Sequence, residues 1–340
     1  MRSLAQKAQE ETRWNYLSGR IKALEKELIS PNQYQSLISA KDQYELLRSL
    51  SDSPYKSIVR QEEDLFDYEK ILNDHLAAKL QWIRKYSPQT LVYDYFTVRG
   101  NIQSFKAGIK SYLSQLPRNE ELSEQRLEDT QFYGSAFKGD EIPQEYLTAY
   151  REVIRKYREK KSLQAVDFEA DRQMLAILHQ MADASSNEMM RKYTQSFIEL
   201  KNLCALWRLK ALGAPAAMIS DIVFIPPQSG LTMNIMLELY EASYDRWPLM
   251  LSGHGYRDVF TGQGASREMS STALGLEKRC DDFLMDILKR AKYIPFGIEV
   301  AFAYTAALFM EVLNIKIIII AKINHVTEDL IRVKVRQGYV

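Results

Sequence analysis

A ten-residue pattern of apolar and polar positions occurs three times along the chain. The copies read FTVRGNIQSF, FIELKNLCAL and FMEVLNIKII. In each copy a Phe is followed five positions later by an Asn, and apolar residues stand one and four positions after that Asn. The asparagines are Asn101, Asn202 and Asn314, so the intervals are 101 and 112 residues. Intervals of this length are too long for a solenoid repeat and suit a small domain. The pattern therefore predicts three copies of one unit with approximate threefold symmetry.

A helix turns about 100° per residue, which places each Asn and its two apolar neighbours within one narrow sector. The preceding phenylalanines are Phe96, Phe197 and Phe309. They point to the opposite side, so we expect each helix to be buried on two sides, as the central helix of a small bundle. Each Asn then lies at the edge of a buried face and needs hydrogen-bond partners. Glu199 and Glu311 stand three residues before their Asn and could hold its amide or a nearby backbone group, whereas the first copy has Val98 there. A catalytic role for the asparagines is the alternative to this structural one.

The repeat extends upstream of each Asn helix. A long amphipathic segment precedes it, and we expect that segment to open with an apolar–acidic pair. The pairs are Phe66-Asp67, Phe168-Glu169 and Leu276-Glu277. Each unit is thus predicted to be a long helix, a break and the Asn helix, followed by a loop with Gly or Pro and another helix. The loops run from Pro117 to Pro143 and from Gly213 to Gly230. The predicted repeats cover residues 1–116, 117–213 and 214–340.

The first and third repeats also share a leading pair of helices. The segment LELYEASYDRWPLMLSGHGY resembles QSLISAKDQYELLRSLSDSPY near the N-terminus. The matched positions are Leu37 with Leu239, Ala40 with Ala242, and Tyr55 with Tyr256. The corresponding segment of the second repeat, around Tyr146, matches less well.

The composition favours an all-α fold. The chain has 340 residues, 46% hydrophobic and 26% charged, with only 14 Gly and 10 Pro, and long stretches have a period near 3.6. Lys and Arg number 45 against 44 Asp and Glu, so no bulk charge indicates binding to nucleic acid or acidic lipid. Cys204 and Cys280 lie within helical patterns and are expected to be reduced core residues. The N-terminal sequence has no apolar core of the kind found in signal peptides.

The apolar segment from Phe296 to Ile320 is a candidate for a membrane span. Glu299, Glu311, Asn314 and Lys316 interrupt it, and a charge near the centre of a bilayer costs about 2.5–3.5 kcal/mol. We therefore predict two consecutive buried helices here, and no membrane-spanning segment.

The sequence offers no catalytic, cofactor-binding or metal-binding residues. The four histidines stand singly, and we expect none to have a Cys, His or carboxylate at metal-ligand spacing. TGQGAS at Thr261 lacks the Lys of a phosphate-binding loop, and GHG at Gly253 is interpreted as a turn that ends a helix. Cys280-Asp281-Asp282 continues an amphipathic helix. The basic run from Arg151 to Lys161 has interleaved glutamates and is interpreted as a solvated helix face, with a contact surface for a partner as the alternative.

Several segments resemble the C subunit of the archaeal and bacterial A/V-type rotary ATPases, whose eukaryotic counterpart is the d subunit. These are YLSGRIKAL near Tyr16, SPY at Ser53, and IELKN ending at Asn202. The most similar stretch is FGIEVAFAYTAALFMEVLNIKIIIIAKIN, which begins at Phe296 and is followed by TEDLIR and a closing Tyr-Val. The similarity covers nearly the whole chain in order. Val98 and the Pro226-Pro227 doublet depart from the family's pattern.

The resemblance implies a funnel of three similar helical lobes with no enzymatic activity and no cofactor. Such a subunit would be present once per complex, on the cytoplasmic face of the membrane. There it would join the central-stalk subunits D and F to the proteolipid rotor ring during ATP-linked proton or sodium transport, binding no nucleic acid and no small-molecule substrate. Two alternatives remain: a helical-repeat scaffold for unrelated partners, and an enzyme with a dispersed site.

Overall fold

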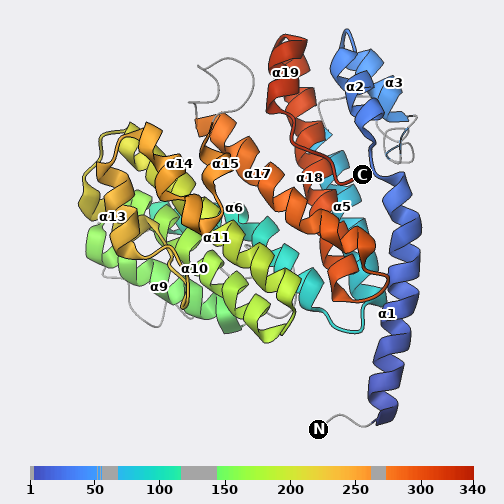
Figure 1. The fold of residues 1–340 in the computed structure, drawn as a ribbon, viewed down its shortest axis with the longest axis horizontal. Helices are drawn as coiled ribbons and strands as arrows, with labels where there is room; N and C mark the ends of the chain where they lie inside the picture. The colour runs from blue at the N-terminus through green and yellow to red at the C-terminus, as the bar shows by residue number, and fades with distance from the viewer. Residues whose placement is uncertain (1–3, 52, 54, 56–67, 116–143, 262–272) are drawn as a thin grey trace. The chain divides into compact units, whose positions relative to one another are not determined.

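All regular structure in the described part of the chain is helical, which confirms the predicted all-α fold (Figure 1). The computed structural model describes residues 4–51, 53, 55, 68–115, 144–261 and 273–340. The chain divides into two compact units. Unit 1 comprises Met1–Tyr93, Asn187–Tyr193 and Asp245–Val340, and unit 2 comprises Asp94–Ser186 and Thr194–Tyr244.

The α-helices of unit 1 are α1 (Leu4–Leu24), α2 (Pro31–Ser39), α3 (Gln43–Ser51), α5 (Tyr68–Tyr86), α14 (Trp247–Met250), α15 (Arg257–Phe260), α17 (Ala273–Lys289), α18 (Ile298–Ile323) and α19 (Glu328–Lys334). Those lying wholly or mainly in unit 2 are α6 (Leu91–Gln115), α9 (Gln144–Lys160), α10 (Leu163–Ala184), α11 (Glu188–Ala211), α12 (Ile219–Ile222) and α13 (Met233–Glu241). Short 3-10 helices are η1 (Glu25–Glu27), η3 (Ala216–Met218), η4 (Tyr244–Arg246), η5 (Ser252–His254) and η6 (Arg290–Tyr293).

The predicted order of a long helix, a break and an Asn helix is confirmed in all three places. The pairs are α5 with α6, α10 with α11, and α17 with α18. The expectation that an apolar–acidic pair opens the long helix is wrong for the second copy. There α10 begins at Leu163, five residues before Phe168, because the Ser162 side chain accepts a hydrogen bond from the backbone N–H of Gln164 and caps the helix. The first such pair, Phe66-Asp67, and the loop at 117–143 lie outside the described residues.

The segment predicted as two consecutive helices is one helix of 26 residues, α18. Its sequence has no Gly or Pro between Ile298 and Ile323, so nothing in it breaks the backbone ladder. The helix begins after Gly297, whose φ of +133° is accessible only to glycine and where a Cβ would meet the Glu299 carboxylate. Glu311 and Asn314, two of the polar residues that interrupt the apolar run, have hydrogen-bond partners in the folded chain, and Lys316 donates to Asn73 at the surface.

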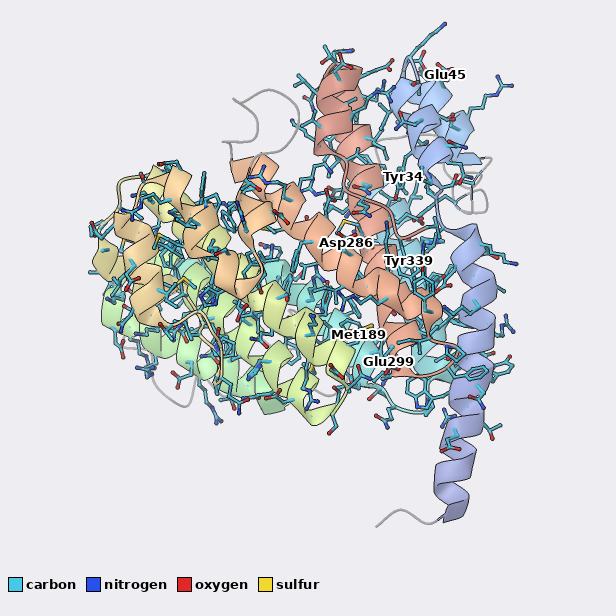
Figure 2. The ribbon with its side chains drawn as sticks, in the orientation of Figure 1. Tyr34, Glu45, Met189, Asp286, Glu299 and Tyr339 are labelled. Carbon is cyan, nitrogen blue, oxygen red and sulfur yellow. The ribbon has the colours of Figure 1, made fainter. Side chains whose placement is uncertain are left out.

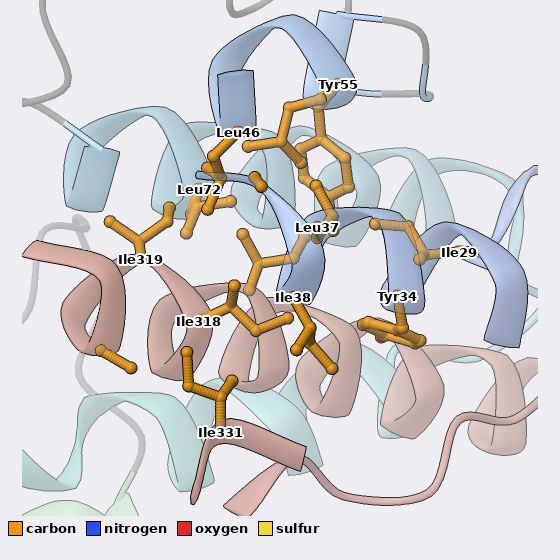
Figure 3. Close-up of a cluster of buried hydrophobic side chains, with 14 of the residues drawn as sticks. Ile29, Tyr34, Leu37, Ile38, Leu46, Tyr55, Leu72, Ile318, Ile319 and Ile331 are labelled. Carbon is orange, nitrogen blue, oxygen red and sulfur yellow. The ribbon is translucent and has the colours of Figure 1, made fainter. Parts of the chain in front are cut away.

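The core of unit 1 is built around α18, which contacts α1, α3, α5, α17 and α19. Figure 3 shows side chains of α2, α3 and α5 meeting those of α18 and α19. Ile318 is fully buried in this cluster, and Ile38, Tyr55 and Ile331 lie in it as well. The cluster therefore joins segments from both ends of the chain.

Unit 2 has its own core, in which α10 packs against α9 and α12. Phe96 and Phe197, the phenylalanines of the first two Asn helices, are buried as predicted. The Nζ atom of Lys106 lies 2.5 Å from Asp171 Oδ1, and this ion pair ties α6 to α10. Helix α11 ends at Ala211, two residues before Gly213, whose φ of +61° suits a glycine that follows a helix. The division into repeats at 1–116, 117–213 and 214–340, and their threefold symmetry, remain predictions.

Candidate functional site

A buried carboxylate links α18 to segments near the N-terminus. Glu311 is 4% exposed. Its Oε2 accepts a hydrogen bond from the backbone N–H of Ile29 at 2.5 Å, and its Oε1 accepts one from the Tyr55 hydroxyl at 2.9 Å. These donors lie 282 and 256 residues away along the chain. The carboxylate thus fixes two positions near the N-terminus, Ile29 and Tyr55, against α18.

The surroundings of Glu311 change the protonation of several groups. Burial raises the pKa of Glu311 to about 7, although the hydrogen bonds from Ile29 and Tyr55 act in the opposite direction. Burial raises the pKa of Tyr55 and the negative charge of Glu311 raises it further. The Tyr55 ring lies 4.4 Å from the imidazole of His75. Burial, with a smaller effect of the nearby Lys79, lowers the pKa of His75 to about 4.

Glu311 and His75 should make opposite contributions to the pH dependence of folding. A carboxyl with a pKa near 7 in the folded state and 4.5 when unfolded stabilises the fold less as pH rises through that interval. An imidazole whose pKa falls from 6.5 to about 4 stabilises the fold less as pH drops through that interval. The two effects oppose each other between about pH 4.5 and 6.5.

The variant Glu311→Gln should therefore expose the contribution of His75. Gln is neutral like the protonated acid, and can accept from Ile29 and donate to Tyr55. Between pH 6.5 and pH 5 its free energy of unfolding, measured with urea, should fall by about 1–2 kcal/mol more than that of the wild type. The surface variant Glu328→Gln serves as the control. Equal pH dependence in Glu311→Gln and wild type would show that Glu311 is ionised throughout this range.

The second and third Asn side chains make the same pair of hydrogen bonds. Asn202 donates to the carbonyl of Phe224 at 2.6 Å and accepts from its N–H at 3.1 Å. Asn314 donates to the carbonyl of Arg336 at 3.0 Å and accepts from its N–H at 2.8 Å. In both cases the partner lies 22 residues further along the chain. Each Asn side chain therefore pairs with the backbone N–H and carbonyl of one residue in the segment after its helix, as a neighbouring β-strand would. This is a structural role.

For the first copy of the pattern, the structure describes Asn101 but not the segment that corresponds to its expected partner. Asn101 is half-buried, and the residue 22 positions after it lies outside the described residues. Of the two expected roles of the preceding glutamates, Glu311 binds a backbone group, because it accepts from the N–H of Ile29 as well as from Tyr55. Glu199 Oε1 accepts from Ser229 Oγ at 2.8 Å. Both carboxylates thus bind the segment before a nine-residue helix, since Ile29 precedes α2 and Ser229 precedes α13.

The shared leading helices of repeats one and three have matching ends. Both α2 and α13 are nine residues long. Ser30 and Thr232 cap them by accepting from the backbone N–H three residues on, and Ala40 and Ala242 are the C-terminal capping residues. Leu37 and Leu239 are buried, as are Tyr55 and Tyr256. The structure supports the pairing of these segments that the sequence indicated.

The segment after α19 is fastened to other parts of unit 1. Arg336 Nε lies 3.1 Å from Asp281 Oδ2, and the N–H of Gln337 donates to Asp282 Oδ1 at 2.7 Å. The Tyr339 hydroxyl donates to Glu25 Oε1 at 3.2 Å. Figure 2 shows Tyr339 in the same region of unit 1 as Asp286 of α17. The Asp281-Asp282 pair thus has a structural role, because it holds this segment in place.

Aromatic and cationic side chains gather on one part of the surface of unit 1. The guanidinium carbon of Arg20 lies 5.9 Å from the ring centroid of Tyr16 and 5.6 Å from that of Trp82. Tyr, Trp and Arg are among the residues enriched in protein–protein interfaces. We call the surface formed by Tyr16, Arg20 and Trp82 the aromatic edge. The turn after α17 is held to α1 by hydrogen bonds from Lys22 to two of its carbonyls, and it separately exposes 90% of Tyr293.

The described residues show no assembled chemical centre. Within them, no group of three or more His, Cys, Asp or Glu side chains is placed to hold a metal ion. His179 Nε2 does lie 3.3 Å from Asp183 Oδ2 one turn later, so the expectation that no histidine has a carboxylate at such spacing is wrong, but two residues do not make a site. Cys204 and Cys280 are buried and are not part of a disulfide, as predicted for reduced core residues. Gly255 has a φ of +80° and ends η5, which confirms GHG as a turn.

Likewise, no helix among the described residues is long and apolar enough to cross a bilayer.

Sequence reasoning found Glu311 and Tyr55 separately but did not predict their hydrogen bond. No local spacing relates residues 256 positions apart. The repeated pattern was the one feature of the sequence that singled out both residues. Tyr55 matched Tyr256, and Glu311 matched Glu199, so both residues stood out as shared positions before their contact was known.

The fold and its buried polar links define a helical protein whose distant segments are tied to a central helix, with no assembled chemical centre among the described residues. Residues 17–334 match the model of the ATP synthase (C/AC39) subunit family, and the chain belongs to this family. It is 21% identical over 334 residues to the C subunit of the V-type sodium ATPase of Enterococcus hirae, covering 96% of this chain and 99% of that protein.

Two archaeal proteins are similar to the same degree, and both are C subunits of an A-type ATP synthase. The protein of Methanocaldococcus jannaschii is 21% identical over 337 residues, covering 93% of this chain and 84% of that protein. The protein of Pyrococcus horikoshii is 22% identical over 323 residues, covering 90% of this chain and 85% of that protein.

Proposed function

We propose that this chain is a non-catalytic adaptor of an A/V-type rotary ATPase, which joins the central stalk of subunits D and F to the membrane proteolipid ring. The observation that carries the proposal is the family match, which runs from residue 17 to residue 334. The relatives named above are matched over most of their own length, at 84–99%. The similarity therefore concerns a whole subunit and is not confined to one shared module.

The structure supports such a role by its mechanical character. An adaptor that carries torque must transmit force without deforming, and densely packed helices have low compressibility. Glu311 ties α18 to two segments of the first repeat, and Asn314 ties it to the segment after α19. These links couple distant parts of unit 1 to one central helix, so that a force on one part is carried by the others.

The surface supports it as well. The aromatic edge has the composition of a protein contact, with Arg20 close to the rings of Tyr16 and Trp82. Tyr293, in the turn after α17, is a second exposed aromatic residue of unit 1. One copy per complex, at the cytoplasmic face of the membrane and held there through the rotor ring, would place the chain between shaft and ring. Whether protons or sodium ions move would be decided by the ring.

Removing this chain should uncouple ATP hydrolysis from ion movement. Membranes from a strain that lacks it should keep their proteolipid ring and lose ATP-driven ion transport, whereas the released catalytic head should still hydrolyse ATP. The measurement compares ATP turnover with ion uptake in inverted vesicles, and re-expression of the wild-type chain should restore transport.

A control distinguishes the adaptor from a general scaffold. A strain re-expressing the surface variant Lys192→Gln, at an exposed position of α11, should transport ions like the wild type. Normal ATP-driven transport in membranes without the chain would refute the adaptor role and favour a helical-repeat scaffold for unrelated partners.

A further inference from the structure

Unit 2 contains a hollow lined by α6, α10, α11 and the segment after α11, with a volume of about 550 Å³. Seven residues of α11 and its C-terminal end line it. Five of them recur every three or four positions and so form one stripe along the helix: Phe197, Lys201, Ala205, Arg208 and Leu212. At a rise of 1.5 Å per residue, the stripe is about 22 Å long. The lining thus follows one face of α11 over a length that a partner helix could match, and we call this hollow the unit 2 groove.

The lining of the groove combines an apolar floor with cationic walls. Phe168 and Leu175 of α10 contribute to the floor, together with Phe197 of α11. The cationic residues are Arg99, Lys106, Lys201 and Arg208. The guanidinium carbon of Arg99 lies 4.5 Å from the ring centroid of Phe197, and Lys201 Nζ lies 5.6 Å from it. Positive charge is thus placed directly against the apolar floor.

The lining carries an excess of positive charge. Among the described residues that line it, Asp171 is the one carboxylate, and it already forms an ion pair with Lys106. Four cations therefore stand against one anion, in a chain whose overall net charge is only +1. An occupant that complements this lining must be acidic as well as apolar.

A smaller hollow of about 170 Å³ extends the groove. It shares Gln164, Phe168 and Met218 with the main hollow and adds Lys156 and Lys160. Its own carboxylates are engaged: Asp221 lies 3.5 Å from Lys160, and Glu169 lies 3.0 Å from Arg172. The rim also presents Leu212, which is 82% exposed. An exposed apolar residue at the end of a basic groove is what a partner's apolar face would cover.

We propose that the unit 2 groove is the docking site of an acidic amphipathic helix from a partner protein. The apolar face of that helix would pack on Phe168 and Phe197, and its carboxylates would meet Lys201 and Arg208. Helix-in-groove recognition of this kind depends on apolar anchors at i, i+3, i+4 and i+7. Charge complementarity would select an acidic partner over a basic one and speed its association. The proposal does not depend on the adaptor role.

The test uses the full chain and a fluorescent peptide of about 18 residues, with Leu at i, i+3, i+4 and i+7 spacing and Glu at most other positions. Fluorescence anisotropy should show binding that weakens with salt. The double variant Lys201→Glu with Arg208→Glu should weaken binding by about tenfold or more, because two attractive charges become repulsive. The double variant Arg191→Glu with Lys192→Glu makes the same charge change at exposed positions of α11 outside the groove, and should bind like the wild type.

Two further measurements separate shape from charge. Ala205→Trp fills the groove without changing its charge and should abolish binding, while thermal melting monitors folding. A peptide with Lys in place of Glu should bind the Lys201→Glu, Arg208→Glu variant better than it binds the wild type. Equal binding of acidic and basic peptides by the wild type would overturn the proposal. So would binding of phosphatidylglycerol vesicles through Lys201 and Arg208 without binding of the peptide, which would make the groove a lipid site.

Discussion

Replacing Ile318 with Asp should unfold unit 1 at ordinary growth temperatures. Ile318 is fully buried in the cluster formed by α2, α3, α5, α18 and α19 (Figure 3). The described residues that make up this cluster are apolar and include no cation that could pair with a carboxylate, so the variant would bury an uncompensated charge or force the helix out of the core. The expected loss of unfolding free energy is about 4 kcal/mol or more. Thermal melting followed by circular dichroism, with binding of a hydrophobic dye as a second probe, measures it.

Ile320 supplies the matched control, because it lies on the same helix two residues later and is 45% exposed. Ile320→Asp should melt within a few degrees of the wild type, since a half-exposed carboxylate keeps its water. Wild-type melting of Ile318→Asp would mean that this face of α18 does not form the core of unit 1.

Replacing Asn314 with Leu should give the second largest loss of stability. Leu is branched at Cγ like Asn but cannot satisfy the N–H and carbonyl of Arg336, which the Asn314 side chain binds in a fully buried position. Losing both hydrogen bonds should cost about 2–4 kcal/mol in the free energy of unfolding, measured with urea. Asn202→Leu should cost a similar amount, because Asn202 makes the same two bonds to Phe224.

The control for both is Asn324→Leu. Asn324 lies exposed at the end of α18, and its side chain donates a hydrogen bond to the carbonyl of Ile320 one turn earlier. A change of less than about 1 kcal/mol is expected there. If Asn202→Leu were harmless while Asn314→Leu was not, the two asparagines would differ in function despite their common geometry.

Much of the fold followed from periodicity in the sequence. The three pairs of long helices were predictable because apolar residues recur with the helical period and Gly and Pro are scarce within these segments. The burial of Phe96 and Phe197 opposite the Asn face followed from the same geometry. The error came at α18, where the segment interrupted by Glu311, Asn314 and Lys316 was predicted to form two consecutive helices and forms one. A polar residue interrupts an apolar pattern without breaking the backbone, and only the folded core shows that it is satisfied.

The buried polar links were predictable in kind but not in detail. The position of Asn314 at the edge of a buried face indicated that its amide must find partners. Which partners it finds depends on where the chain returns after α19, and no pattern of side chains encodes that return. The contact between Glu311 and Tyr55 is still less accessible, since it depends on packing between the two ends of the chain. Residues from three helices line the basic groove of unit 2. The sequence pattern of one helix indicates only the stripe that this helix contributes, so the groove was not predictable from it.

The hydrogen bond between Ile29 and Glu311 also bears on how the chain is made. The two residues are 282 positions apart, and a ribosome adding about 5–20 residues per second needs roughly 15–55 seconds to separate them. During that time the apolar face of α2 has been synthesised but α18 has not. Unit 2 is built mostly from residues between Asp94 and Tyr244, so its partners emerge close together. The N-terminal helices stay without their partner α18 until that helix has been synthesised. They are therefore the part of this chain that most needs protection from aggregation before synthesis is complete.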